Sequence, residues 1–176
     1  MSHGPAPEAA PAASFLSRRI VAPLAWIGGA LSTLLILFTL VLIVVAVVRR
    51  YVLADPLRFT DEVTGWALVA IVMFGAAEAY RRGDHIAIDL LTSRASPRAQ
   101  RVLGAVSDLA VLAFAGVLGW SAWHAIAFAR GFGMYTIGHI EVETWILQTP
   151  LVAGAVLLGL SAVAKLVDRI VGGAAP

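Results

Sequence analysis

Four acidic or basic side chains lie within the long apolar segments of this sequence. Glu78 and Asp108 are acidic, while Lys165 and His124 are basic. A charge inside a membrane-crossing helix usually marks an ion or proton pathway, because it is costly in hydrocarbon. Glu78 stands four residues before Arg82, a spacing that suits an ion pair along one helix. We expect the carboxylates to be interfacial anchors or partner contacts and Lys165 to snorkel outwards; the alternative is a transport role for Glu78 or Asp108.

The residue types give little support to other chemistry. A membrane haem needs paired imidazoles at one depth, but His85 falls in a predicted loop on one side, and His124 and His139 fall near the other boundary. Glu141 and Glu143 do not make up a metal-ligand set, and the chain has no cysteine. We therefore expect no enzyme activity, no catalytic or substrate-binding residue, no metal and no cofactor. A membrane anchor for a redox enzyme, which would bind haem or quinone, stays open as a further class.

The segments that carry these residues are apolar enough to cross a bilayer. Hydrophobic residues make up 60% of the 176-residue chain and charged residues only 14%, whereas a soluble domain has roughly a quarter charged residues. Since about 20 apolar residues span the hydrocarbon core, the sequence predicts an all-α integral membrane protein. A disordered tail (1–17) precedes the membrane domain (18–170), and a short tail (171–176) follows it. The four predicted transmembrane helices cover about 25–48, 63–80, 102–128 and 144–167.

The expected helix ends agree with these spans. Thr60 is a plausible N-cap of the second helix, where Glu62 in the first turn suits the helix dipole. Ser96-Pro97 predicts the start of a third helix that outruns the bilayer, and Pro150 either starts or bends the fourth. Aromatic residues form the belts typical of the two interfaces. Trp26 and Tyr80 fall on one side, and Tyr51, Trp66, Trp120, Trp123 and Trp145 on the other.

Lys and Arg residues outside the spans are unequally divided between the two sides. The amino tail, the second loop and the carboxyl end carry nine, with Lys165 in the last turn of the fourth span included, against four (Arg49, Arg50, Arg58 and Arg130) on the other side. Because basic residues are enriched in cytoplasmic loops, we expect both termini to be cytoplasmic.

The most distinctive stretch begins at the end of the first span and continues through the second loop. An Arg-aromatic pair is followed by Pro-Leu and an acidic helix start, then by Gly-Ala within the second span and His-Ile-x-x-Asp after it. In this order the elements resemble the small membrane subunit, the DctQ-type protein, of tripartite ATP-independent periplasmic (TRAP) transporters. The usual aromatic after Pro-Leu is replaced by Arg58-Phe59-Thr60. The matching positions are Arg50, Tyr51, Pro56, Leu57, Glu62, Gly75, Ala76, His85, Ile86 and Asp89.

The resemblance implies a subunit of a bacterial inner-membrane complex. In that family a large membrane subunit of about a dozen helices carries the substrate and sodium sites, and a periplasmic binding protein delivers an organic acid such as a dicarboxylate. The small subunit extends the scaffold of the large one. Arg81 and Arg82 join the matching positions as candidate partner or lipid contacts, because arginines in the second loop would attract anionic headgroups if this loop lay along the interface. An ordinary solvated loop is the alternative there. A self-sufficient homo-oligomeric transporter or channel using Glu78 or Asp108 remains the competing function.

Overall fold

The described part of the chain forms four long helices. The computed structural model describes residues 19, 21–82 and 97–172, and its helices are α1 (Ala22–Tyr51), α2 (Thr60–Arg82), α4 (Pro97–Gly131) and α5 (Thr144–Gly172). All four are long and apolar enough to cross a membrane, which confirms the predicted all-α, four-span fold. The predicted disordered tail, an interfacial segment in the second loop with His85 and Asp89, and the last four residues of the C-terminal tail lie outside the described residues.

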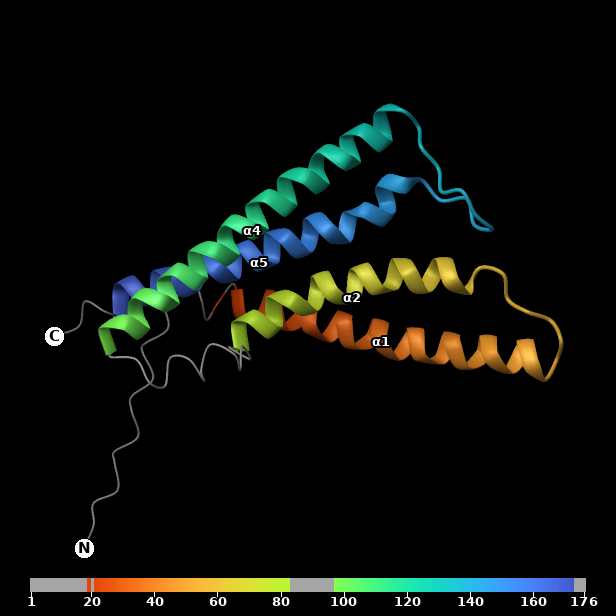
Figure 1. Ribbon diagram of the computed structural model, residues 1–176, viewed down its shortest axis with the longest axis horizontal. Helices are drawn as coiled ribbons and strands as arrows, with labels where there is room; N and C mark the ends of the chain where they lie inside the picture. The colour runs from red at the N-terminus through yellow and green to blue at the C-terminus, as the bar shows by residue number, and fades with distance from the viewer. Residues whose placement is uncertain (1–18, 20, 83–96, 173–176) are drawn as a thin grey trace, which may run out of the picture.

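The four helices lie in a row rather than around a common centre (Figure 1). Helix α1 packs along α2, α2 along α5, and α5 along α4, while α1 touches α5 over a short length. At one end, which we call the closed end, α1 and α4 begin and α2 and α5 finish. At the other, the splayed end, the α1–α2 and α4–α5 hairpins diverge (Figure 1). The row therefore has two hairpins that pack on each other through α2 and α5.

Small residues fill the contacts between these helices. Most of the buried apolar positions are alanines, among them Ala25, Ala77, Ala155 and Ala162. Large apolar side chains instead point outwards, as at Leu34 of α1, which is 63% exposed. Without a hydrophobic effect between helices in lipid, close backbone approach through small residues is what stabilises their packing. The exposed aliphatic surface fits the surroundings of a membrane.

One expected helix end differs from the prediction. Thr60 is the first residue of α2 and does not cap it, because its hydroxyl donates to the Leu57 carbonyl at 3.3 Å. The predicted start of the fourth helix at Thr144 is confirmed, and of the two roles expected for Pro150 the helix start is excluded, since α5 runs through the proline. A proline leaves the carbonyl four residues earlier without its amide partner. Here the hydroxyl of Thr149 donates to that carbonyl, of Ile146, at 2.6 Å.

Candidate functional site

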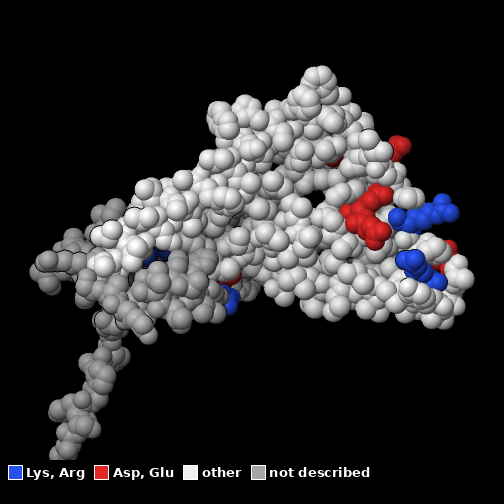
Figure 2. Space-filling model, viewed as in Figure 1, with Lys and Arg blue, Asp and Glu red and all other residues white. Residues whose placement is uncertain are grey.

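The ionisable side chains of the described helices gather at the two ends of the row. Figure 2 shows acidic and basic groups at the splayed end and a second group towards the closed end, with an uncharged body between them. At the closed end they belong to α2, α4 and α5. We call this set the closed-end cluster; it comprises Glu78, Tyr80, Arg81, Arg82, Asp108, Lys165 and Arg169.

Asp108 of α4 is the centre of this cluster. One of its carboxylate oxygens accepts the hydroxyl of Tyr80 at 2.5 Å, and the other accepts Nε of Arg169 at 2.6 Å. Asp108 and Tyr80 are each only 3% exposed. A buried carboxylate is tolerated when its charge is paired and its lone pairs are occupied. Since α2 and α4 are not neighbours in the row, Asp108 ties the outermost helix to both inner ones.

Lys165 of α5 turns inwards and does not snorkel to the interface as expected. Its ammonium group donates to the backbone carbonyl of Tyr80 at 2.5 Å and lies 4.3 Å from the centroid of the Tyr80 ring. A cation over an aromatic face is attracted by the ring quadrupole. Tyr80, predicted as an interfacial aromatic, is buried between this lysine and Asp108, so its ring packs inside the bundle.

Glu78 is held by two successive arginines of its own helix. Arg81 donates from Nε and a terminal amino group at 2.7 and 2.8 Å, and Arg82 donates from Nε at 2.6 Å. The predicted pairing with Arg82 is confirmed, and Arg81 adds the planar two-point contact that favours carboxylates. Glu78 packs against Gly29 of α1, where a Cβ would come within 2.8 Å of its side chain. Glu78 and Asp108, the two carboxylates of the competing transport hypothesis, are therefore both paired with arginines.

A second polar contact, the splayed-end clasp, joins α2 to the loop between α4 and α5. One oxygen of Glu62 accepts the backbone N–H of His139 at 2.8 Å and lies 3.1 Å from Nδ1 of its ring, and the other accepts the N–H of Ile140 at 3.3 Å. This loop is itself ordered by backbone bonds from Thr136 to Val142 and from Thr144 to Met134. The clasp therefore anchors a preformed loop onto the first turn of α2.

We predict that Glu62→Ala releases the loop without unfolding the helices. The amides of His139 and Ile140 should exchange hydrogen several-fold faster, because their acceptor is lost. Hydrogen exchange read by mass spectrometry on the purified chain measures this. Glu141→Ala, which removes an exposed carboxylate of the same loop, is the matched control and should leave the exchange unchanged. Equal exchange in both variants would contradict the clasp.

The positions of the family-like motif do not converge on one site. Arg50 and Tyr51 end α1, where the guanidinium lies 5.8 Å from the centroid of the exposed tyrosine ring. Pro56 and Leu57 lie in the turn before α2. Gly75 lies at the α1–α2 contact, where a Cβ would come 3.0 Å from the hydroxyl of Ser32. Of the remaining described positions, Ala76 lies within α2 and Glu62 makes the splayed-end clasp. Arg81 and Arg82 belong to the closed-end cluster.

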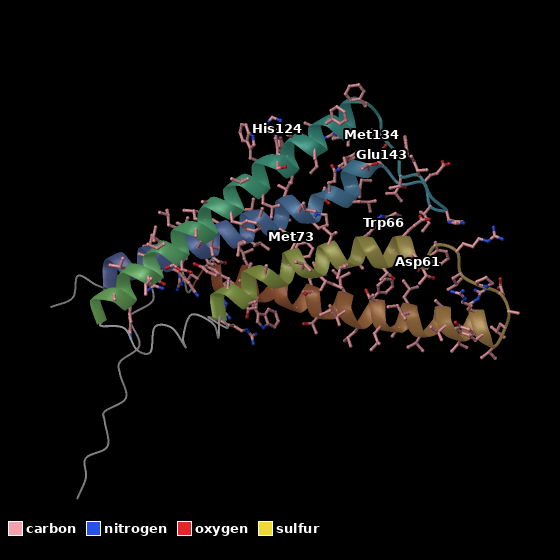
Figure 3. All side chains as sticks on the ribbon, viewed as in Figure 1. Asp61, Trp66, Met73, His124, Met134 and Glu143 are labelled. Carbon is pink, nitrogen blue, oxygen red and sulfur yellow. The ribbon has the colours of Figure 1, made fainter. Side chains whose placement is uncertain are left out.

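Besides the splayed-end clasp, three contacts at that end were not predicted from the sequence. Arg49 at the end of α1 pairs with Asp55 in the following turn. The indole of Trp145 donates to Glu143, and the guanidinium of Arg130 lies 4.9 Å from the Trp145 ring centroid. His124 points away from the other helices and contacts the ring of Trp120 at 4.7 Å (Figure 3). No group of three His, Cys, Asp or Glu side chains able to hold a metal ion occurs within the part of the chain described.

Comparison with known proteins matches the sequence to a transporter family. The model of the DctQ component of tripartite ATP-independent periplasmic transporters matches residues 39–172, which include all of α2, α4 and α5. The chain is 30% identical over 95 residues to the C4-dicarboxylate TRAP transporter small permease protein DctQ of Pseudomonas aeruginosa. The aligned part covers 53% of this chain and 45% of that protein, so it spans less than half of the relative.

Proposed function

This chain belongs to the DctQ component family of TRAP transporters, and on that premise we propose that it is the small permease subunit that scaffolds a large membrane subunit. In this proposal the large subunit holds the substrate and sodium sites, and a periplasmic binding protein delivers the substrate. The complex lies in the bacterial inner membrane with both termini of this chain in the cytoplasm. The chain contributes no catalytic residue, cofactor, metal site or substrate site of its own.

The observation that supports the scaffold role is the position of the charged side chains along the helices. The carboxylates of the long spans, Glu78 and Asp108, lie towards the closed end of the row, where arginines bind them. A transport path across a membrane normally needs polar groups near the bilayer midplane. Four helices in a row with outward aliphatic side chains suit lateral contact with further helices. An organic acid is the expected substrate class, and a C4-dicarboxylate is the first to test because the Pseudomonas aeruginosa relative is named for it.

Reconstitution tests this function directly. Liposomes containing this chain with its large subunit and the binding protein should take up a labelled C4-dicarboxylate when a sodium gradient is applied. Liposomes lacking this chain should show little uptake, because the large subunit loses its support. Uptake is measured by filtration and counting, with collapse of the sodium gradient as the control. Sodium-driven uptake by this chain alone would overturn the scaffold role and favour the homo-oligomeric transporter.

A further inference from the structure

A groove between α1 and α2 opens at the closed end, beside the closed-end cluster. Its volume is about 380 Å³, and its lining includes Trp26, Gly29, Thr33, Gly75, Glu78 and Arg82. The groove extends over eight residues of each helix, 26–33 and 75–82; the seven steps between the first and the last residue make about 10 Å at 1.5 Å per residue. The groove between α4 and α5 is different, because its lining is made only of Gly, Ala, Leu and Val. A polar groove on the side of membrane-spanning helices calls for a ligand with a polar group.

We propose that this groove binds the phosphate-bearing headgroup of one membrane phospholipid. The proposal depends on the membrane-spanning fold and on the groove, and it holds whether or not the chain supports a large subunit.

The charge at and beside the groove is positive. The lining carries the Glu78 carboxylate and the Arg82 guanidinium, and Arg81, which is not part of the lining, adds a second guanidinium bound to Glu78. Glu78 takes up only the Nε–H of Arg82, whose side chain stays 57% exposed. The terminal amino groups of Arg82 are therefore at the groove with one unit of positive charge in excess. A guanidinium in this position suits a phosphate oxygen, with which it forms charge-assisted hydrogen bonds.

An apolar track continues from the groove towards the middle of the helices. On α1 the residues that follow Thr33 on the same face are Leu37 and Leu40, which are 53% and 57% exposed. On α2 the residues that precede Gly75 on the same face are Val72 and Leu68, which are 57% and 59% exposed. A polar pocket near a helix end with an aliphatic track leading inwards has the polarity of a phospholipid and not of a free anion.

The indole of Trp26 indicates how deep the groove lies in the membrane. This side chain is 60% exposed at the start of α1. Exposed tryptophans of membrane helices are enriched at the level of the lipid headgroups. Arg82 ends α2 at the same end of the row. The phosphate of a phospholipid in that leaflet would therefore lie at the height of the guanidinium.

Native mass spectrometry of the purified full-length chain, released from detergent micelles with added phosphatidylglycerol, tests the proposal. The wild-type chain should retain one phospholipid. Arg82→Gln removes the charge and should lower the bound fraction about tenfold, since a hydrogen bond to a charged group is worth roughly that factor. Ala79→Trp fills the groove from an exposed position of α2 and should also lower the bound fraction, because the indole occupies the space of the headgroup. Arg58→Gln at the splayed end and Ala113→Trp on the exposed side of α4 are the matched controls and should retain the lipid.

Each other outcome overturns the proposal. Equal retention in all five proteins would mean that the groove does not bind the lipid, and loss in Ala79→Trp alone would mean that the headgroup is not recognised. Displacement of the lipid by inorganic phosphate would identify a free-anion site. If Ala79→Trp abolished co-purification of a large subunit while lipid retention stayed unchanged, the groove would hold a partner helix instead. Circular dichroism on each variant verifies that helix content is preserved.

Discussion

Replacing Asp108 by Ala is expected to lower the free energy of unfolding of the purified chain by about 3 kcal/mol. Removing one partner of a buried ion pair costs about 3–5 kcal/mol when the other charge is left buried. The guanidinium of Arg169 is 41% exposed and regains part of its hydration, so the lower end of that range applies. Tyr80 also loses the acceptor of its buried hydroxyl. Unfolding in mixed micelles with increasing sodium dodecyl sulfate, followed by circular dichroism, measures the change.

Asp55→Asn is the matched control for this prediction. It breaks the ion pair with Arg49, whose side chains are 38% and 64% exposed, and exposed pairs contribute roughly 0–1 kcal/mol. The combined replacement Tyr80→Phe, Asp108→Leu and Arg169→Leu removes all the partners together and should recover most of the lost stability, because no buried polar group stays unpaired. A change below about 1 kcal/mol for Asp108→Ala would show that the closed-end cluster does not hold the hairpins together.

Asp108 also distinguishes the scaffold from a transport path. If this carboxylate relayed a proton or an ion, Asp108→Asn would abolish uptake while leaving the complex assembled. For a scaffold, uptake should fall only as far as the yield of assembled complex falls. Co-purification and uptake measured on the same preparation of that variant separate the two. The same comparison on Glu78→Gln covers the other carboxylate of the competing function.

The membrane class and the four helices were predictable from the sequence because they depend on long apolar runs and on local end signals. The Glu78–Arg82 pair was predictable for the same reason, since a spacing of four residues brings two side chains together on one helix. The one expected end that was wrong, the cap at Thr60, depends on a neighbouring backbone group, the carbonyl of Leu57. The exact first and last residues of a helix are the least certain part of a prediction from sequence.

The contacts between helices were not predictable from the sequence. Tyr80 and Asp108 are 28 positions apart, and Glu62 and His139 are 77 apart, so their pairing depends on the order and rotation of the helices. In a soluble helix the polar face indicates which side is buried. A helix such as α1, apolar on all sides from Pro23 to Val48, gives no such sign. The glycines in the sequence indicate where two helices can approach closely, but only the structure shows which helix each glycine contacts.

Gly154→Leu is the second large effect that we expect, with a loss of about 3 kcal/mol in the free energy of unfolding. A Cβ at Gly154 would lie 2.6 Å from Cβ of Met73 and 2.7 Å from its carbonyl oxygen; Met73 lies between α2 and α5 in Figure 3. The carbonyl oxygen of Met73 belongs to the backbone and its Cβ is bonded to it, so neither atom can move aside alone. The two helices must separate instead, and overpacking of this kind costs about 1–3 kcal/mol or more. Because α2 and α5 are the main contact between the two hairpins, the splay should widen.

The chain has no cysteine, so spin labels can be attached at introduced cysteines without removing any native one. Val72 of α2 and Val156 of α5 are both exposed and can carry the labels. The distance between the two labels should rise by several ångströms in Gly154→Leu, which is at most about the radius of a helix with its side chains. Gly116→Leu is the control, because nothing lies within 4 Å of a Cβ at that position of α4. The same side chain is added at both sites, so the difference between the variants isolates the close approach of α2 and α5. Equal distances and equal stabilities would mean that this approach does not hold the hairpins in register.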